Sequence, residues 1–199
     1  DGLTGRIINF PKEGDVLPET YYFSWGESKQ KIIDLMMKSM TIKLNDEWLK
    51  RSQEIFIKNK REAIILASII EKETSLSNEK SLVSSVFHNR LRIGMRLQSD
   101  PTVAYGLMIK NNHELKKIKS KDIKVHTMYN TYLNYGLPPG PISNPGLDSI
   151  KAALNPKRTD YLYFVANGRG GHNFATKYSD HITNIKKWKK IVNSKKRKN

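Results

Sequence analysis

Cysteine is absent from this chain of 199 residues. Its absence excludes disulfide bonds, thiolate nucleophiles and cysteine-ligated zinc, and it fits both a reducing cytoplasm and an exported bacterial protein without disulfides. Long apolar runs are also missing: none approaches the roughly 20 residues that span a bilayer, and no segment resembles a signal peptide. The 5 histidines show no paired metal-ligand spacing, so we expect neither a metal nor another cofactor.

Acidic residues are scarce beside basic ones. Lys and Arg total 35 against 19 Asp and Glu, which gives a formal net charge of +16. A field of this sign attracts polyanions such as nucleic acids, acidic lipid surfaces or an anionic cell wall. The charge alone does not choose among them. The length suffices for one full hydrophobic core.

Apolar spacing and turn residues predict a helix-rich chain with one β-hairpin. The expected helices lie at 28–59 (two helices), 61–74, 79–91 and 147–154. A tail helix with apolar positions from 182 to 191 is expected to end in the basic run 195–198. Residues 96–106 are polar and turn-prone, and 108–127 indicate a lysine-rich solvated excursion. Prolines and glycines within 137–146 predict a rigid loop. Aromatic and β-branched residues at 161–165, followed by a glycine-rich turn and 172–176, predict the two paired strands.

An apolar segment, 63–70, is followed by two acidic residues, Glu71 and Glu73. Carboxylates beside a hydrophobic core are costly unless they are paired or neutral, and a raised pKa is what a general acid at neutral pH requires. Because each helical residue turns about 100°, Glu71 and Glu73 lie about 200° apart and point to opposite sides. They therefore do not act as a pair on one bond. The residues alone leave open whether one is catalytic or both are solvated helix-end carboxylates.

Several sequence blocks occur in a fixed order between about Glu13 and about Trp188. They are Glu13–Tyr21, Glu71-Lys72-Glu73-Thr74, Ser85–Val103, Tyr129–Tyr132, Gly136–Ile142, Tyr161–Ala166 and Gly170–Phe174. In these blocks the chain resembles the endolytic murein transglycosylases, also called the MltG or YceG-like family. Blocks of this length in one order are highly specific for that family.

The resemblance implies an α+β fold, with a helix-rich, lysozyme-like catalytic domain and a small antiparallel β-sheet. It implies a lyase that cleaves the β-1,4 bond between N-acetylmuramic acid and N-acetylglucosamine within nascent glycan strands. Such cleavage leaves 1,6-anhydromuramic ends and terminates strand elongation. In the family the catalytic carboxyl is the second Glu of the Glu-Lys-Glu-Thr motif, which is Glu73 here. We expect a partly desolvated Glu73 with a raised pKa, because Leu66 and Ile69 share its side of the helix.

Further substrate-binding residues are expected with this site. They are Thr74, Gln98, Asp100, Thr102, Tyr105, Asn130, Tyr132, Pro139 and His172. Asp100 is either a second carboxylate that stabilises oxocarbenium-like charge or a turn residue before a proline. Asn130 and Tyr132 either position the catalytic carboxyl and the substrate or form a loop cap. His172 either faces the cleft or is structural.

We interpret 1–27 as a loop-rich entry segment of the catalytic region, 28–192 as the catalytic transglycosylase domain and 193–199 as a basic tail. Family members carry a membrane anchor and a LysM-like domain before the catalytic part. We therefore expect the native protein to be anchored in a bacterial inner membrane by a single pass and to act in the periplasm. The expected partners are peptidoglycan glycan strands and the glycan polymerase machinery, without specific nucleic-acid binding.

The alternative hypothesis is a basic nucleic-acid or cell-wall binding module without catalysis. It rests on the net charge of +16 and on the lysine-rich end of the chain, while the usual nucleic-acid binding signatures are missing from the sequence. The amphipathic tail helix is either a surface-seeking helix or a solvated helix that packs through its Ile and Trp face.

Overall fold

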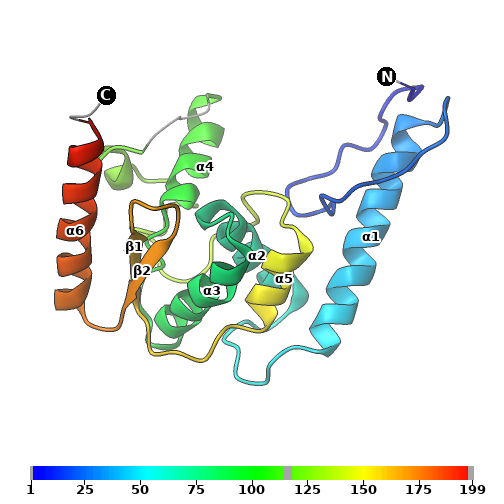
Figure 1. The fold of residues 1–199 in the computed structure, drawn as a ribbon. Coiled ribbons are helices and arrows are strands. Elements are labelled where there is room, and N and C mark those ends of the chain that lie inside the picture. The colour runs from blue at the N-terminus through cyan, green and yellow to red at the C-terminus, as the bar shows by residue number, and fades with distance from the viewer. Residues whose placement is uncertain (1, 114–117, 197–199) are drawn as a thin grey trace.

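The computed structural model describes residues 2–113 and 118–196. In chain order the elements are α1 (Lys29–Leu49), α2 (Lys60–Glu73), α3 (Ser77–Arg92), α4 (Asp100–Asn111), the 3₁₀ turn η1 (Asp122–Lys124), α5 (Leu147–Leu154), β1 (Tyr163–Ala166), β2 (His172–Ala175) and α6 (Tyr178–Lys196). Helices α2, α3 and α5 form the centre, with α1 at one end and the β-hairpin with α6 at the other (Figure 1). The expected α+β class is confirmed, and its lysozyme-like character stays a prediction.

The core is built around α2. Every residue from Ala63 to Ile70 is buried, because a helix that is apolar nearly all round has no face to give to water. The helix begins with the Asn59 side chain accepting a hydrogen bond from the Glu62 backbone, which satisfies one of the free N–H groups of the first turn. Helices α5 and α3 pack against α2. Burial ends after Ile70, because Glu71 and Glu73 are half-buried and Lys72 is exposed, so the final turn of α2 lies at the edge of the core.

The proline-rich loop at 137–146 is fastened to α2 by a buried serine. Ser68 Oγ donates to the Ile65 carbonyl at 2.7 Å and accepts from the Ile142 backbone N–H at 3.0 Å. Ser143 Oγ donates to the Ser68 carbonyl at 3.1 Å. These bonds pair polar groups that the core would otherwise leave unsatisfied. They confirm the expected non-helical loop and hold it against the helix that ends in Glu73.

Two sequence-based expectations about helices are wrong. Residues 28–59 contain one helix, α1, and the chain is irregular from Lys50 to Asn59. Backbone groups of that segment bond to distant partners instead: Ser52 donates to the Leu154 carbonyl and Phe56 to His88 Nδ1. Tertiary contacts therefore override the helical pattern there.

The other error concerns 96–106, expected to be turn-prone, and the solvated excursion expected from 108. Helix α4 starts at Asp100 and continues to Asn111, with a proline in its first turn. Proline early in a helix and an acidic residue in the first turn are helix-start signals, so a turn interpretation of Asp100-Pro101 missed them.

The β-hairpin and the tail helix are confirmed. Strands β1 and β2 pair antiparallel, with Tyr163 opposite Ala175 and Ala166 opposite His172. Helix α6 packs on this hairpin and extends to Lys196, so it crosses the expected boundary at 192, while residues 197–199 of the expected basic tail lie outside the described residues. None of the helices in the described ranges is long and apolar enough to span a bilayer.

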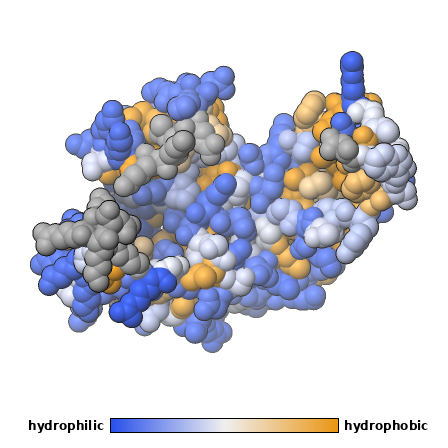
Figure 2. Space-filling view, turned by 45° about the horizontal axis from the view of Figure 1, so that its top comes forward, coloured by the Kyte–Doolittle hydropathy of each residue, from blue (hydrophilic) through white to orange (hydrophobic). Residues whose placement is uncertain are grey.

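The surface is uneven in its polarity. Most of the face seen in Figure 2 is hydrophilic, and apolar residues gather at the end formed by the N-terminal segment and α1. Exposed apolar side chains of that segment include Ile8, Phe10, Tyr22 and Trp25.

Glu71 joins three helices at the end of α2. Its Oε2 accepts hydrogen bonds from Lys80 Nζ of α3 at 3.1 Å, from Ser149 Oγ of α5 at 2.5 Å and from the Gly146 backbone at 3.2 Å. Burial opposes ionisation of Glu71, but the bonds from Ser149, Lys80 and Gly146 outweigh it and lower its pKa. Glu71 is therefore an ionised structural tie rather than a solvated helix-end charge.

Glu71→Ala is expected to lower the free energy of unfolding by about 2–4 kcal/mol, because it leaves the buried Lys80 ammonium without its partner. Urea denaturation at neutral pH measures this. The control is Lys72→Ala at the exposed neighbouring position, which should change stability little. If Glu71→Ala/Lys80→Met is no more stable than Glu71→Ala alone, the unpaired ammonium is not the cause.

Candidate active site

Glu73 is the last residue of α2 and opens into a cavity of about 480 Å³. The wall comes from α3 (Arg90), the residues around the start of α4 (Gln98, Asp100), Tyr132, the strand β1 (Tyr163, Phe164, Val165) and α6 (Tyr178, His181, Ile185, Trp188). Its size is that of a small-molecule site. Five separate segments therefore converge on one half-buried carboxyl group.

Ser99 is the direct partner of Glu73. Its Oγ donates to Glu73 Oε1 at 2.5 Å, and its own backbone N–H donates to Thr131 Oγ1 at 3.0 Å. Ser99 is itself buried and immediately precedes α4. The bond therefore holds the Glu73 carboxyl in one orientation at the wall of the cavity.

Glu73 has a pKa raised to about 7. Burial is the largest cause, and the negative charge of Asp100 adds to it, while the hydrogen bond from Ser99 and the positive charge of Arg90 act in the opposite direction. The raised pKa expected from the sequence is therefore present. A carboxyl group with this pKa holds a proton in about half of the molecules at neutral pH.

Arg90 supplies a fixed positive charge near Glu73. Its side chain is buried, and the guanidinium donates to the Leu162 carbonyl at 2.7 Å and to the Leu97 carbonyl at 2.6 Å. Its centre lies 5.5 Å from the ring of Tyr163. Arg90 thereby ties the residue before β1 to the segment before α4, and both β1 and the segment before α4 contribute residues to the cavity wall.

Asp100 gives the cavity a second carboxylate in a different environment. It is exposed, and its Oδ1 accepts a hydrogen bond from Tyr132 Oη at 2.6 Å. Burial and this bond to Asp100 raise the pKa of Tyr132, so the phenol stays protonated and remains the donor. Two carboxyl groups thus share the cavity, and the more buried one is Glu73.

Among the residues expected to bind substrate, three line the Glu73 cavity: Gln98, Asp100 and Tyr132. Gln98 has φ of 50°, a left-handed conformation that is uncommon outside glycine. Its backbone N–H donates to the Thr131 carbonyl, which fixes the segment that carries Ser99 and Asp100.

Three other expected residues have their polar groups engaged inside the protein. Thr74 caps the end of α2, and its Oγ1 accepts from the Leu76 backbone. Thr102 is fully buried and bonds to the Ser99 carbonyl and to Thr131 Oγ1. Asn130 is buried and donates to the Ile123 and Val125 carbonyls, so the loop-cap alternative describes its geometry. Their contacts support the shape of the site without lining the cavity.

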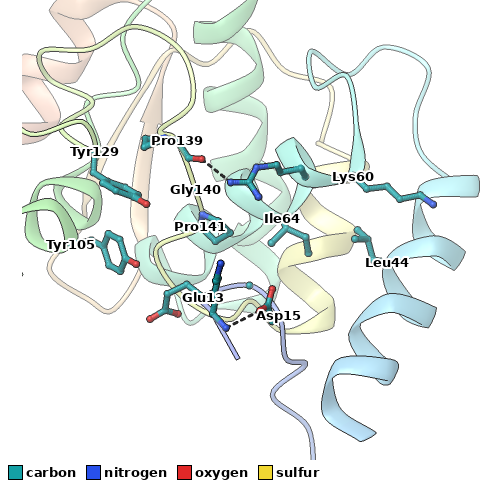
Figure 3. A pocket seen from close by; sticks show the side chains of 13 residues that line it. Glu13, Asp15, Leu44, Lys60, Ile64, Tyr105, Tyr129, Pro139, Gly140 and Pro141 are labelled. Carbon is teal, nitrogen blue, oxygen red and sulfur yellow. Dashed lines mark hydrogen bonds between the residues drawn. The ribbon is translucent and has the colours of Figure 1, made fainter. Parts of the chain in front are cut away.

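The remaining three lie elsewhere. Tyr105 and Pro139 line a separate pocket (Figure 3). His172 bonds to Glu79 through its ring Nδ1 at 2.7 Å and through its backbone N–H at 2.9 Å, which attaches β2 to α3. The structural alternative thus describes the contacts of His172.

Sequence reasoning missed the contribution of α6 and of Arg90 and Ser99. The residues of α6 that line the cavity recur at helical spacing, as Tyr178, His181, Ile185 and Trp188. This spacing was the sequence feature that could have predicted a helix face directed toward the cavity. Within the described residues His181 Nδ1 is buried and has no hydrogen-bond partner. Its ring stacks on Tyr163 with centroids 5.1 Å apart. Burial and the nearby Arg90 lower its pKa, which favours the neutral imidazole.

The motif order and this geometry agree with a comparison against known families. The model of the YceG-like family matches residues 4–187. The chain belongs to the YceG-like family. A crystal structure of a YceG-like protein from Listeria monocytogenes superposes with a TM-score of 0.72 at 40% identity, covering 90% of this chain and 56% of that one.

Two curated relatives are named endolytic murein transglycosylase. The protein from Bacillus subtilis strain 168 is 36% identical over 188 residues, covering 91% of this chain and 50% of the relative. The protein from Streptococcus pneumoniae D39 is 32% identical over 175 residues, covering 87% of this chain and 31% of the relative. The YceG-like chain described here therefore spans half or less of the curated relatives it matches.

Ser99→Ala is expected to raise the pKa of Glu73 by about one unit, because a hydrogen bond that favours the ionised carboxyl is removed. A carbon-detected NMR titration of labelled Glu side chains measures this without any substrate. Ser194→Ala, on the exposed end of α6, serves as the control. An unchanged Glu73 titration would mean that the Ser99 bond does not tune this group.

Glu73→Gln is expected to stabilise the fold at alkaline pH. The Glu73 carboxyl titrates near 4.5 in the unfolded chain and at about 7 in the folded chain. Below pH 4.5 it is protonated in both states, and the fold has its full stability. As the pH rises through 7, the unfolded chain is favoured because its carboxyl ionises more easily, and the free energy of unfolding falls. At pH 8 the variant should therefore exceed the wild type by about 1–3 kcal/mol, and the difference should vanish below pH 4.5. Equal denaturation curves at pH 8 would contradict the raised pKa.

Proposed function

We propose that this chain carries the catalytic part of an endolytic murein transglycosylase. It cleaves the β-1,4 bond between N-acetylmuramic acid and N-acetylglucosamine within nascent glycan strands and leaves 1,6-anhydromuramic ends. Such cleavage terminates strand elongation. The observation that carries the proposal is Glu73, a half-buried carboxyl with a pKa of about 7 at the wall of a cavity. The names of the curated relatives support it.

Glu73 serves both proton transfers of the reaction. Protonated Glu73 first gives its proton to the glycosidic oxygen as the bond from that oxygen to C1 of the muramic sugar breaks. The resulting carboxylate then takes the proton of the C6 hydroxyl while the C6 oxygen bonds to C1. The acid is regenerated, and atoms and charge balance without water. A pKa near the working pH makes both steps accessible to one group.

The surroundings of Glu73 favour this alternation. The bond from Ser99 and the charge of Arg90 stabilise the carboxylate between the two steps. Asp100, oriented by Tyr132, adds negative charge to the same cavity, which would stabilise oxocarbenium-like charge at C1. Aromatic rings of Tyr163, Tyr178 and Trp188 form a wall suited to the apolar faces of sugar rings. By filling the cavity, a bound strand would exclude water and favour the internal nucleophile.

The test is a digestion of isolated peptidoglycan with product identification by mass spectrometry. Wild type is expected to release 1,6-anhydromuramic products, and Glu73→Gln to lose at least a hundredfold in rate, because one group performs both transfers. Glu19→Gln, at an exposed site outside the cavity, is the matched control and should keep full activity.

Two results would overturn this mechanism. Full activity of Glu73→Gln would remove Glu73 from the reaction. Reducing ends in place of anhydro ends would indicate hydrolysis, in which water is the nucleophile and Asp100 acts as the second carboxylate.

We further propose that the protein acts on the outer side of a bacterial inner membrane, in the periplasm, next to the glycan polymerases that make its substrate. A membrane anchor outside the sequence described here would keep it there. The net charge of +16 supports a place beside anionic wall and membrane surfaces. Because a transglycosylase that ends strand growth needs nascent strands, polymerases are the partners this function requires.

A further inference from the structure

A second pocket, of about 610 Å³, lies between the N-terminal segment, the start of α2 and the loop at 139–141. Figure 3 shows Tyr105, Tyr129, Pro139 and Pro141 arranged around it, with Glu13 and Asp15 approaching from the N-terminal segment. Neither the proton transfers at Glu73 nor the cavity around it uses these residues. We call this region the second pocket.

The second pocket is charged with both signs. Lys12, Lys60 and Arg61 contribute positive groups, and Glu13 and Asp15 contribute carboxylates. Within the described residues none of these five side chains forms an ion pair with a protein group. The contacts they do make are to neutral groups: Lys60 donates to Asn45 Oδ1, Arg61 donates to the Pro139 carbonyl at 3.0 Å, and Asp15 accepts from the Lys12 backbone at 2.8 Å. Their charges remain available to a ligand.

The floor of the second pocket is preformed. The rings of Tyr105 and Tyr129 meet edge to face with centroids 4.8 Å apart. Gly14, at φ of 87°, lies so close to Ile64 and Pro141 that a Cβ there would come within 2.7 Å of each. Its backbone N–H donates to Asn144 Oδ1 at 2.8 Å. A rigid aromatic floor reduces the entropy that a ligand loses on binding.

A third cavity, of about 500 Å³, adjoins the second pocket. It shares Glu13 and Tyr105 with the second pocket. Its lining also includes Lys72 and Pro101, which are the direct chain neighbours of Glu73 and Asp100. The third cavity and the Glu73 cavity therefore both have lining residues at the end of α2 and at the start of α4.

We propose that the second pocket binds a peptide branch of the murein strand whose glycan occupies the Glu73 cavity. This inference rests on the proposed function. The sugars of murein are uncharged once the lactyl carboxyl is joined to its peptide, whereas the peptide branches carry free carboxylates and an amine. Lys12 and Arg61 match the carboxylates, and Glu13 and Asp15 match the amine. A polyanion such as a wall phosphate polymer would find the two acidic groups repulsive.

The test compares two substrates with one double variant. Lys12→Gln/Glu13→Gln removes one charge of each sign at exposed positions and leaves the net charge unchanged. Its control, Lys121→Gln/Glu19→Gln, does the same at exposed positions outside the second pocket. The substrates are uncrosslinked strands with peptides and the same strands stripped of peptides by an amidase.

On peptide-bearing strands the double variant should raise KM about three- to tenfold, as expected for two partly exposed charge pairs, with kcat unchanged. On stripped strands it should match the control. An equal rise of KM on both substrates would show that the pocket reads sugars, and no change on either would show that it binds nothing relevant. Both results would overturn the proposal.

A binding measurement separates this proposal from the function on which it rests. A synthetic pentapeptide with free carboxylates and one lysine amine is titrated into the Glu73→Gln chain and followed by NMR. Chemical-shift changes at Tyr105 and Tyr129 that disappear in the Lys12→Gln/Glu13→Gln variant support peptide binding in the second pocket. This conclusion holds even if the wild type cleaves neither substrate, because a lack of cleavage would contradict only the proposed reaction. Shifts elsewhere, or shifts that persist in the variant, overturn the pocket.

Discussion

The burial of the central two turns of α2 is the constraint on which the rest of the structure depends. A helix whose residues from Ala63 to Ile70 are all inside must be covered on every side, and α3, α5 and the proline-rich loop provide that cover. Its last turn then leaves the core carrying two carboxyl groups. Desolvation at that point is unavoidable for both, and the protein meets it in two different ways.

Glu71 and Glu73 differ in how their burial is compensated. Glu71 receives three hydrogen bonds, one of them from a lysine, and its pKa falls. Glu73 receives one bond from Ser99, faces the negative charge of Asp100, and its pKa rises to about 7. The same helix end thereby holds one carboxyl that is ionised at neutral pH and bonded to its neighbours, and another that exchanges its proton at neutral pH. The tie at Glu71 is what fixes the geometry in which the second group can work.

Much of the secondary structure followed from local pattern. The apolar run before Glu71, the hairpin at Tyr163–Ala175 and the tail helix were all readable because period and turn residues agree there. The end of α1 at Leu49 and the start of α4 at Asp100 were not predicted from the sequence. In the first, long-range hydrogen bonds replace a helical continuation. In the second, the helix-start signal of Asp100-Pro101 was taken for a turn.

By itself the sequence determined that one buried helix ends in two carboxyl groups pointing to opposite sides, and its ordered motifs pointed to the YceG-like family. Only the tertiary structure decided which carboxyl group is held ionised and which has a raised pKa. Lys80 and Ser149, which bond to Glu71, come from other segments of the chain. So do Ser99 and Asp100, which act on Glu73. The tertiary structure also decided that Thr102 and Asn130 are buried supports while Arg90 and the α6 stripe form the wall. A pKa depends on surroundings in space, which chain order alone does not provide.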